Sequence, residues 1–470
     1  MTQPVIKSNE TDLTALSAAD LMRGYLSRNF SPREVVDAHL SRIDDTGDKF
    51  NAFISICPDI ARAEAREAEK RLMSSSEALP IGFGVPITVK DITPTEGIRT
   101  TRGSAKHAHW IPEFDATAVS RLRKAGSVIL GKTNTSEGAW KAEGSNPTFG
   151  SSLNPFAPGL TSGGSSGGAG VATAMRYGTW ALGTDGFGSI RVPASFCNVV
   201  GFKPTLAAVP YFPVSAEFMS HIGPLTRTVA DARDAFLAMA GPDIRDPLAT
   251  TDMTRLRDER RRSLTIGVLE EVDGDPPDPE VASAADEFVA WLTSEGHRAV
   301  SVQVPTGGAE IVATISMAFA ALELDDDTEA ELERRDQDLV SLRTAASGLS
   351  AVDLAAAQSL RVDYRQRILR IFESVDYVVS PTVSRLPFDV GGHSPSPYSD
   401  DVTHWNRWCS RTYPWNLAGN PAISVPWSNS KDGLPIGMQI IGAVGNDFGV
   451  LDMAAEVELY RPWRDKYAFL

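Results

Sequence analysis

The sequence has little cysteine, no long hydrophobic run and no excess of basic charge, and each absence excludes a class of protein. Its three cysteines are scattered without CxxC spacing, so we expect neither a disulfide framework nor a zinc site, and a reducing, cytoplasmic compartment fits. No stretch approaches the ~18 apolar residues of a membrane span, and residues 1–20 lack the apolar core of a signal peptide. The net charge of -15 argues against nucleic-acid binding, which uses clustered lysine and arginine. We therefore expect a protein that crosses no membrane and binds no nucleic acid.

What is present is a chain with a hydrophobic content of 42%, ample for a large core. Ser31 and Glu34, with Pro32 between them, form a capping-box pattern at the start of a helix. Further helices are expected over 60–72, 116–125, 169–177 and 448–460. Strands are expected over 84–89, 127–130, 179–183, 375–380, 422–426 and 438–441. Because strands alternate with helices, the pattern predicts an α/β fold with a mixed sheet.

The composition changes along the chain without a long linker or an internal repeat, which favours one catalytic domain. We expect 1–75 to be a helical region packed on the core and 76–235 to carry the candidate catalytic residues. Residues 236–370 are more charged and helical, and 371–470 return to the same α/β core. The acidic stretch 323–331 is expected to be a solvated helix face.

Three short motifs suggest other chemistry, but their surroundings favour other interpretations. Residues 126–133 match the phosphate-loop pattern GxxxxGK[ST], yet their apolar middle reads as a strand. Residues 163–167 match the GxSxG elbow of α/β-hydrolases, although a loop and not a strand precedes them; a downstream His404 keeps that alternative open. His107 and His109 form an HxH pair without a third ligand at useful spacing, so we expect surface or capping histidines and no metal.

Amide cleavage needs a hydroxyl nucleophile, a base and N–H donors for the oxyanion. Lys90 follows the apolar run 85–89, and a lysine that burial keeps neutral can act as the base. The alternative is a surface lysine at a strand edge. Two loops rich in glycine and serine, 162–168 and 183–191, can present backbone N–H groups, although either alone is more often a linker or a tight turn.

Together, Lys90 and the two loops resemble the amidase signature family in order and spacing. In that family a 24-residue step separates two catalytic serines, and Ser165 and Ser189 stand at that step here. The resemblance covers about residues 15–465. It includes 115–116, 131–134, 190–194, 201–205, 223–231, 416–422 and 434–439. It implies a central, mixed, twisted β-sheet covered by helices on both faces, no metal or cofactor, and a small-molecule amide substrate; homodimers are common among relatives.

The resemblance also implies a role for each matching position. Ser189 is the acylated nucleophile, Ser165 is the bridging serine on a cis peptide bond, and Lys90 is the base that draws the proton from Ser189 through Ser165. The oxyanion hole is assigned to the N–H groups of Gly186, Phe187, Gly188 and Ser189. Supporting hydrogen bonds are assigned to Ser166, Asp185 and Arg191.

Two aromatic residues depart from the family pattern. Phe187 stands where glycine is usual, and Trp140 stands where a smaller residue is common. If both rings face the cleft, they favour a flat or aromatic substrate; if both pack inward, they do not touch it. Residues 206–210 also replace the usual glycine-bearing turn.

We therefore expect an amidase, with aryl-acylamidase as one form, that releases a carboxylate and ammonia or an amine. One alternative is the glutaminase component of a tRNA-dependent amidotransferase, against which the acidic charge and the weak match over 240–370 argue. The other is a non-catalytic binding protein on the same scaffold, against which the retention of Lys90, Ser165 and Ser189 argues.

Overall fold

The computed structural model describes residues 12–47, 49–74, 78–252, 263–395, 398, 401–464 and 467. The first eleven residues of the segment inspected for a signal peptide lie outside these ranges. Within them, no helix is both long and apolar enough to cross a membrane.

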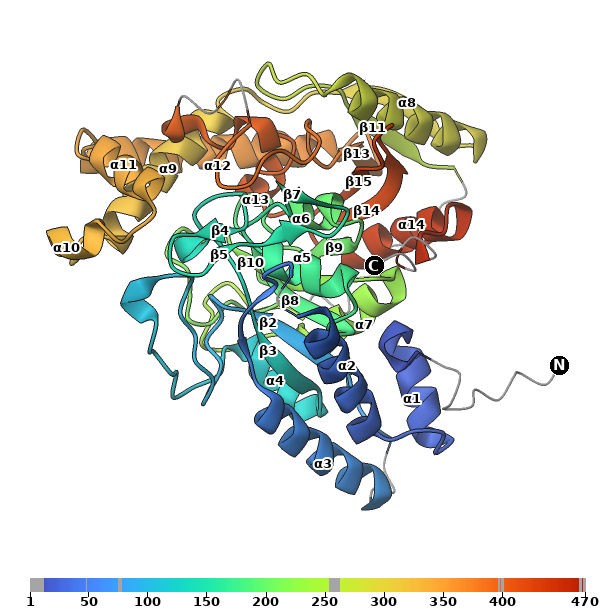
Figure 1. Cartoon of the computed structure of the whole chain (residues 1–470). Helices are drawn as coiled ribbons and strands as arrows, with labels where there is room; N and C mark the ends of the chain where they lie inside the picture. The colour runs from blue at the N-terminus through green and yellow to red at the C-terminus, as the bar shows by residue number, and fades with distance from the viewer. Residues whose placement is uncertain are drawn as a thin grey trace.

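The centre of the molecule is an 11-stranded mixed sheet, counted over the described residues (Figure 1). Its strands, in spatial order, are β1 (Phe53–Ile56), β3 (Val128–Thr133), β2 (Pro86–Lys90), β8 (Trp180–Asp185), β10 (His221–Thr226), β9 (Val200–Lys203), β14 (Ala422–Asn429), β15 (Pro435–Gly442), β13 (Tyr377–Pro381), β11 (Thr265–Leu269) and β12 (Arg298–Val302). β2 runs parallel to β3 and β8, and β11 runs parallel to β12 and β13, while the other pairs are antiparallel. The predicted mixed sheet is confirmed.

Helices flank this sheet and bury it (Figure 1). They are α1 (Ala18–Leu26), α2 (Pro32–Thr46), α3 (Pro58–Ser74), α4 (Thr117–Ala125), α5 (Gly167–Ala174), α6 (Arg191–Phe196), α7 (Val229–Met239), α8 (Pro279–Ser294), α9 (Gly308–Glu323), α10 (Glu329–Leu332), α11 (Gln337–Ala346), α12 (Ala351–Ile371), α13 (Pro414–Ala418) and α14 (Asp447–Tyr460). Every residue of β2, β3 and β8 is buried, so side chains on both faces of these strands are covered. Two small hairpins, β4 (Ser145–Asn146) with β5 (Gly150–Ser151) and β6 (Leu153–Asn154) with β7 (Ala157–Thr161), lie outside the main sheet.

Local sequence signals fixed several element ends. The capping box predicted at Ser31 is present, since its side chain accepts from the N–H of Glu34 and the Glu34 side chain accepts from the N–H of Ser31. The predicted strand inside the phosphate-loop match is β3, so those N–H groups belong to a sheet and do not form a loop around a phosphate.

The regions 1–75 and 236–370 are mainly helical, but each also contains strands that were not expected. The first contains β1, which pairs with β3 at one end of the sheet, and the second contains β11 and β12. β1 has only four residues and β12 has only exposed and half-buried positions, so neither forms an apolar run that stands out in the sequence.

The acidic stretch 323–331 is largely exposed, as expected, but it is not one helix face. α9 ends at Glu323, and the next helix begins only at Glu329. The side chain of Asp327 has no exposed surface and pairs with Arg335 and Lys106, each at 2.6 Å. Two cationic partners make this burial possible. Arg335 lies 8 positions away and Lys106 lies 221 positions away, so no helical or strand periodicity indicates the contact.

Candidate active site

The site forms where two parallel neighbours in the sheet end. β2 ends at Lys90 and β8 ends at Asp185, and parallel strands bring their carboxyl ends to the same edge. The loop after β8 leads into α6, and the loop after β7 leads into α5. These two loops carry Ser189 and Ser165, respectively.

Lys90 is completely buried at the end of β2. Burial lowers the pKa of its amine from the ordinary value of 10.5 to about 7, although the nearby charge of Asp185 acts in the opposite direction. Near neutral pH a large fraction of the amine is therefore uncharged and carries the lone pair that a base needs. The alternative of a surface lysine is excluded.

Ser165 is the hydrogen-bond partner of that lysine. Lys90 Nζ lies 2.6 Å from Ser165 Oγ and 2.9 Å from Thr184 Oγ1. The Gly164–Ser165 peptide bond is cis. A Cβ on Gly164 would lie 2.5 Å from the carbonyl carbon of Glu143, so only glycine fits directly before this serine.

Ser189 sits on the second loop and reaches the open space of the site, with 8% of its surface exposed. Its carbonyl accepts a hydrogen bond from the N–H of Ser166 at 3.2 Å, which ties the two serine loops together. Ser166 Oγ also donates to the carbonyl of Thr184 at 3.2 Å and lies 3.3 Å from its N–H. Ser166 thus holds the loop of Ser165 against the end of β8.

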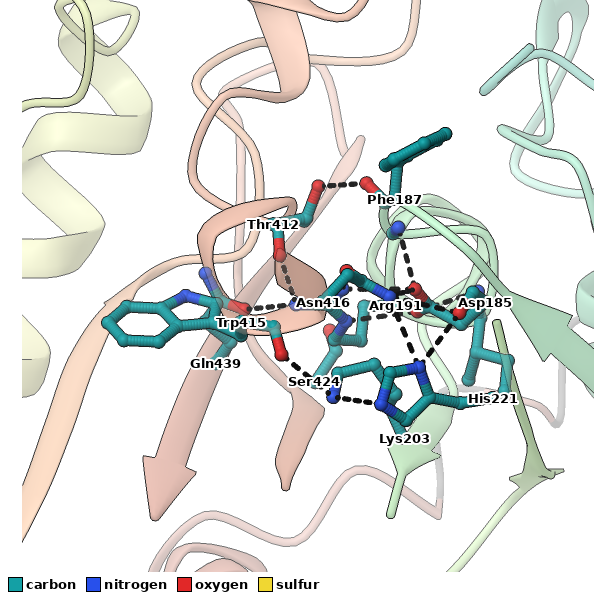
Figure 2. Close-up of polar contacts among 12 residues, drawn as sticks. Asp185, Phe187, Arg191, Lys203, His221, Thr412, Trp415, Asn416, Ser424 and Gln439 are labelled. Carbon is teal, nitrogen blue, oxygen red and sulfur yellow. Dashed lines mark hydrogen bonds and ion pairs between the residues drawn. The ribbon is translucent and has the colours of Figure 1, made fainter. Parts of the chain in front are cut away.

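A buried ion pair between Arg191 and Asp185, drawn in Figure 2, supports the loop that carries Ser189. Arg191 donates to both carboxylate oxygens of Asp185 at 3.0 Å, and neither side chain is exposed. The same carboxylate accepts from the N–H groups of Gly188 at 2.7 Å and Ile190 at 3.1 Å. Burial would raise the pKa of Asp185, but the charge and hydrogen bonds of Arg191 outweigh it and hold that pKa well below its ordinary value.

These contacts divide the four N–H groups expected to form the oxyanion hole into one that already has an acceptor and three that have none within the described ranges. The N–H of Gly188 is already used by Asp185. Among the described residues, none accepts a hydrogen bond from the N–H of Gly186, Phe187 or Ser189.

Phe187 and Trp140 both border the cavity of about 430 Å³ that opens onto Ser189. Their rings pack edge-on against Trp405, with centroids 6.2 and 6.0 Å away, respectively. Figure 2 shows the Phe187 ring pointing away from the buried polar residues, while its carbonyl accepts from Thr412 Oγ1 at 2.5 Å. Each ring therefore packs on a neighbour and also forms part of the cavity wall.

The rest of the cavity wall includes both apolar and charged side chains. The apolar side chains come from α9 and α11 and are Ile315, Phe319, Leu322, Leu339 and Leu342. The charged ones are Arg102, Glu217 and Glu323. Arg102 and Glu323 form an ion pair at 2.9 Å, so this arginine is partly neutralised.

The histidines of the alternative motifs, His107 and His404, do not join the site. Ser165 Oγ is partnered by Lys90, whereas His404 lies 2.7 Å from a carboxylate oxygen of Asp401. His107 contacts the ring of Trp110. Within the described ranges, no three His, Cys, Asp or Glu side chains gather in a way that could hold a metal ion.

Sequence reasoning gave no role to several residues that the fold brings against the site. They are Thr184, Lys203, His221, Thr412 and Asn416. Lys203 and Asn416 lie in segments that resemble the family, which is a usable signal. His221 had none, because it is the first residue of β10 and a polar residue at the start of a strand is ordinary.

Comparison with known proteins agrees with this geometry. A family model described as Amidase matches residues 34–451. An acylamidase of Rhodococcus erythropolis is 33% identical over 97% of this chain and 98% of its own. One component of the glutamyl-tRNA(Gln) amidotransferase of Thermosynechococcus vestitus is 31% identical over 95% of this chain and 98% of its own.

Solved structures give the same result. A bacterial aryl acylamidase of the amidase signature family has a TM-score of 0.88 and 27% identity, over 97% of this chain and 99% of its own. A 6-aminohexanoate cyclic dimer hydrolase has a TM-score of 0.85 and 28% identity, with the same coverage. The surroundings of Lys90, Ser165 and Ser189 described above thus lie in a fold shared over nearly the whole chain.

Proposed function

Because this chain belongs to the amidase signature family and hydrolyses amide C–N bonds, we propose that it cleaves a small-molecule carboxamide through an acyl-enzyme on Ser189. The observation that carries the proposal is the buried amine of Lys90, 2.6 Å from Ser165 Oγ and with a pKa of about 7.

The proposed reaction uses two proton transfers, one from Ser165 to Lys90 and one from Ser189 to Ser165. Lys90 takes the proton of Ser165 while Ser165 takes that of Ser189, and Ser189 Oγ attacks the amide carbon to form a tetrahedral oxyanion. When the C–N bond breaks, the proton returns along the same path to the leaving nitrogen, which departs as ammonia or an amine. Water then attacks the ester by the same base catalysis and releases the carboxylate.

In this proposal the oxyanion is held by the N–H groups of Gly186, Phe187 and Ser189. The N–H of Gly188 is committed to the Asp185 carboxylate, where it fixes the shape of the loop. Donors that are already oriented need not reorganise when the negative charge develops. This preorganisation accounts for most of the rate enhancement at such sites.

We propose an acyl group that is aromatic or otherwise bulky and apolar. The cavity wall of Trp140, Phe187, Trp405 and the side chains of α9 and α11 supports this choice, because such groups favour apolar contact over hydration. The similarity to an acylamidase and an aryl acylamidase supports it as well.

The test is active-site labelling with a fluorophosphonate, followed by peptide mapping. We expect one phosphonyl group on Ser189 and no label in Ser189→Ala, with anilide hydrolysis lost in parallel. Ser41→Ala, on the exposed side of α2, is the control and should label and turn over normally. Label on another residue, or hydrolysis surviving in Ser189→Ala, would refute the nucleophile. Absence of both label and hydrolysis in the unaltered protein would favour a non-catalytic binding protein.

The second candidate is the glutaminase component of a tRNA-dependent amidotransferase, which the similarity to the amidotransferase of Thermosynechococcus vestitus favours. Ammonia release from glutamine, compared with aniline release from anilides, separates the two, and purification of the native complex would reveal partner chains. A homodimer, a cytoplasmic location and the division into four regions stay predictions. Light scattering on the purified protein tests the first of them.

A further inference from the structure

Two buried side chains contact the carbonyl oxygen of the peptide bond between Asp185 and Gly186. Asn416 Nδ2 donates to the Asp185 carbonyl oxygen at 2.9 Å, and His221 Nδ1 lies 3.2 Å from the same oxygen. Figure 2 shows both side chains directed at Asp185. Asn416 has no exposed surface and His221 has 2%, so water does not compete for this oxygen from those positions.

Neighbouring contacts fix which atoms donate. Arg191 donates to Asn416 Oδ1 at 2.6 Å, so the Asn416 NH₂ group is the one that faces Asp185. A carbonyl can only accept, so His221 Nδ1 carries the hydrogen and Nε2 presents its lone pair. Lys203 Nζ lies 3.3 Å from that Nε2.

Lys203 completes the arrangement as a buried hydrogen-bond donor. Besides His221, its nitrogen contacts the carbonyl oxygens of Asn420 and, at 3.4 Å, Trp415. Burial lowers the pKa of its amine well below the ordinary value of 10.5. In either protonation state, an N–H donated to His221 Nε2 draws electron density from the imidazole and strengthens the Nδ1–H as a donor to Asp185.

The N–H of this peptide unit lies on the side of the cavity where the proposed reaction takes place. The Asp185–Gly186 bond is trans, so its N–H points opposite to its carbonyl. The carbonyl points into the buried cluster, whereas Gly186 lines the cavity together with Ser189. Hydrogen bonds accepted by a carbonyl polarise the whole amide and strengthen its N–H by about 10–30% each in condensed-phase estimates.

We infer that His221 and Asn416, supported by Lys203, are positioning residues that orient and polarise the Gly186 N–H toward the oxyanion. This rests on the proposed function, in which that N–H is one of three donors. The three side chains touch no reacting atom and act through one peptide unit.

The inference can be tested without substrate by NMR. The sequence contains three Asp–Gly bonds, Asp185–Gly186, Asp273–Gly274 and Asp432–Gly433, so ¹³C-carbonyl aspartate with ¹⁵N-glycine labelling gives three amide signals. The signal absent from Gly186→Ala belongs to Gly186. That variant is sterically tolerable, because the added Cβ would meet only Ser220 Oγ at 3.4 Å.

Two substitutions of His221 separate its two contacts. In His221→Gln the side-chain oxygen can still accept from Lys203, but no donor remains at the position of Nδ1. In His221→Asn the amide can still donate to the Asp185 carbonyl. We expect an upfield shift of the Gly186 amide proton in the Gln variant, little change in the Asn variant, and no change at Gly274 or Gly433 in either.

Kinetics supply the second readout. We expect His221→Gln to lower kcat about 10-fold with KM within about twofold, a smaller loss than the 10²–10³-fold of removing an oxyanion donor outright. The affinity for a trifluoromethyl ketone, which forms an oxyanion on the nucleophile, should fall in parallel, and His221→Asn should restore most of both.

His39 offers a matched control for a merely structural role. It is also fully buried, with Nδ1 3.0 Å from the carbonyl of Arg176, outside the active site. His39→Gln should leave the Gly186 signal and the ketone affinity unchanged. A Gly186 signal that does not move in His221→Gln, or ketone affinity that stays constant, would overturn the inference. The failure of Ser189→Ala to abolish hydrolysis would overturn the proposed function instead.

Discussion

The amine of Lys90 lies 2.6 Å from the hydroxyl oxygen of Ser165, at the end of a strand where the lysine has no exposed surface. A charged ammonium would be costly there, and a neutral amine needs the hydroxyl as a partner. Burial therefore leaves a large fraction of the amine unprotonated, and so able to accept a proton, near neutral pH.

Activity should depend on pH through this amine. Its pKa is lowered to about 7, so protonation below that pH removes the lone pair. We expect log(kcat/KM) to rise with a slope near one up to about pH 7 and then to level off. A profile measured from pH 5 to 9, with circular dichroism confirming the fold throughout, checks this. A flat profile down to pH 5 would contradict the assignment of Lys90 as the base.

Lys90→Met should abolish activity while the protein stays folded. Methionine fills a similar volume but has no proton to exchange, so we expect kcat to fall by about 10³–10⁴-fold, the scale of general-base catalysis. Turnover of an anilide and the melting temperature should be measured on the same preparation. Full turnover by the folded variant would be incompatible with the mechanism, whereas loss of the fold would call for Lys90→Gln as a second variant.

Asp185→Asn should destabilise the whole protein. The change leaves the guanidinium of Arg191 buried without its carboxylate, and breaking such a buried pair costs about 3–5 kcal/mol. Urea denaturation measures this loss. Asp37→Asn is the matched control, because its 2.9 Å pair with Arg62 is exposed and should change stability by only about 0–1 kcal/mol. Similar losses in the two variants would show that burial of the Asp185–Arg191 pair adds nothing to its contribution to stability.

Phe187→Gly should change substrate preference more than catalysis. The backbone N–H remains, so we expect kcat for a small aliphatic amide to stay within about threefold. The lost ring contact beside Trp405 should raise KM for an aromatic anilide about 10-fold, in line with the ~1–3 kcal/mol of a pocket contact. Steady-state kinetics on the two substrates decide it; an equal fall in kcat for both would mean that the ring shapes the oxyanion loop instead.

The sequence by itself determined the parts of this protein that are encoded locally. The apolar run 85–89 predicted a buried strand, and Lys90 at its end inherits that burial from its neighbours in the chain. The capping box at Ser31 and the apolar middle of β3 are likewise short-range signals, because they depend on residues a few positions apart.

Only the tertiary structure decided which polar groups face one another. The carboxylate of Asp185 takes up the N–H of Gly188 and so removes it from the set of free donors, which no spacing rule reveals. His221 and Asn416 reach the Asp185 carbonyl from positions 36 and 231 residues away, and Asp327 is buried because Arg335 and Lys106 meet it. These contacts depend on the register of strands that are distant in sequence and on the low polarity around them. Both the register and the low polarity arise only when the whole sheet has formed.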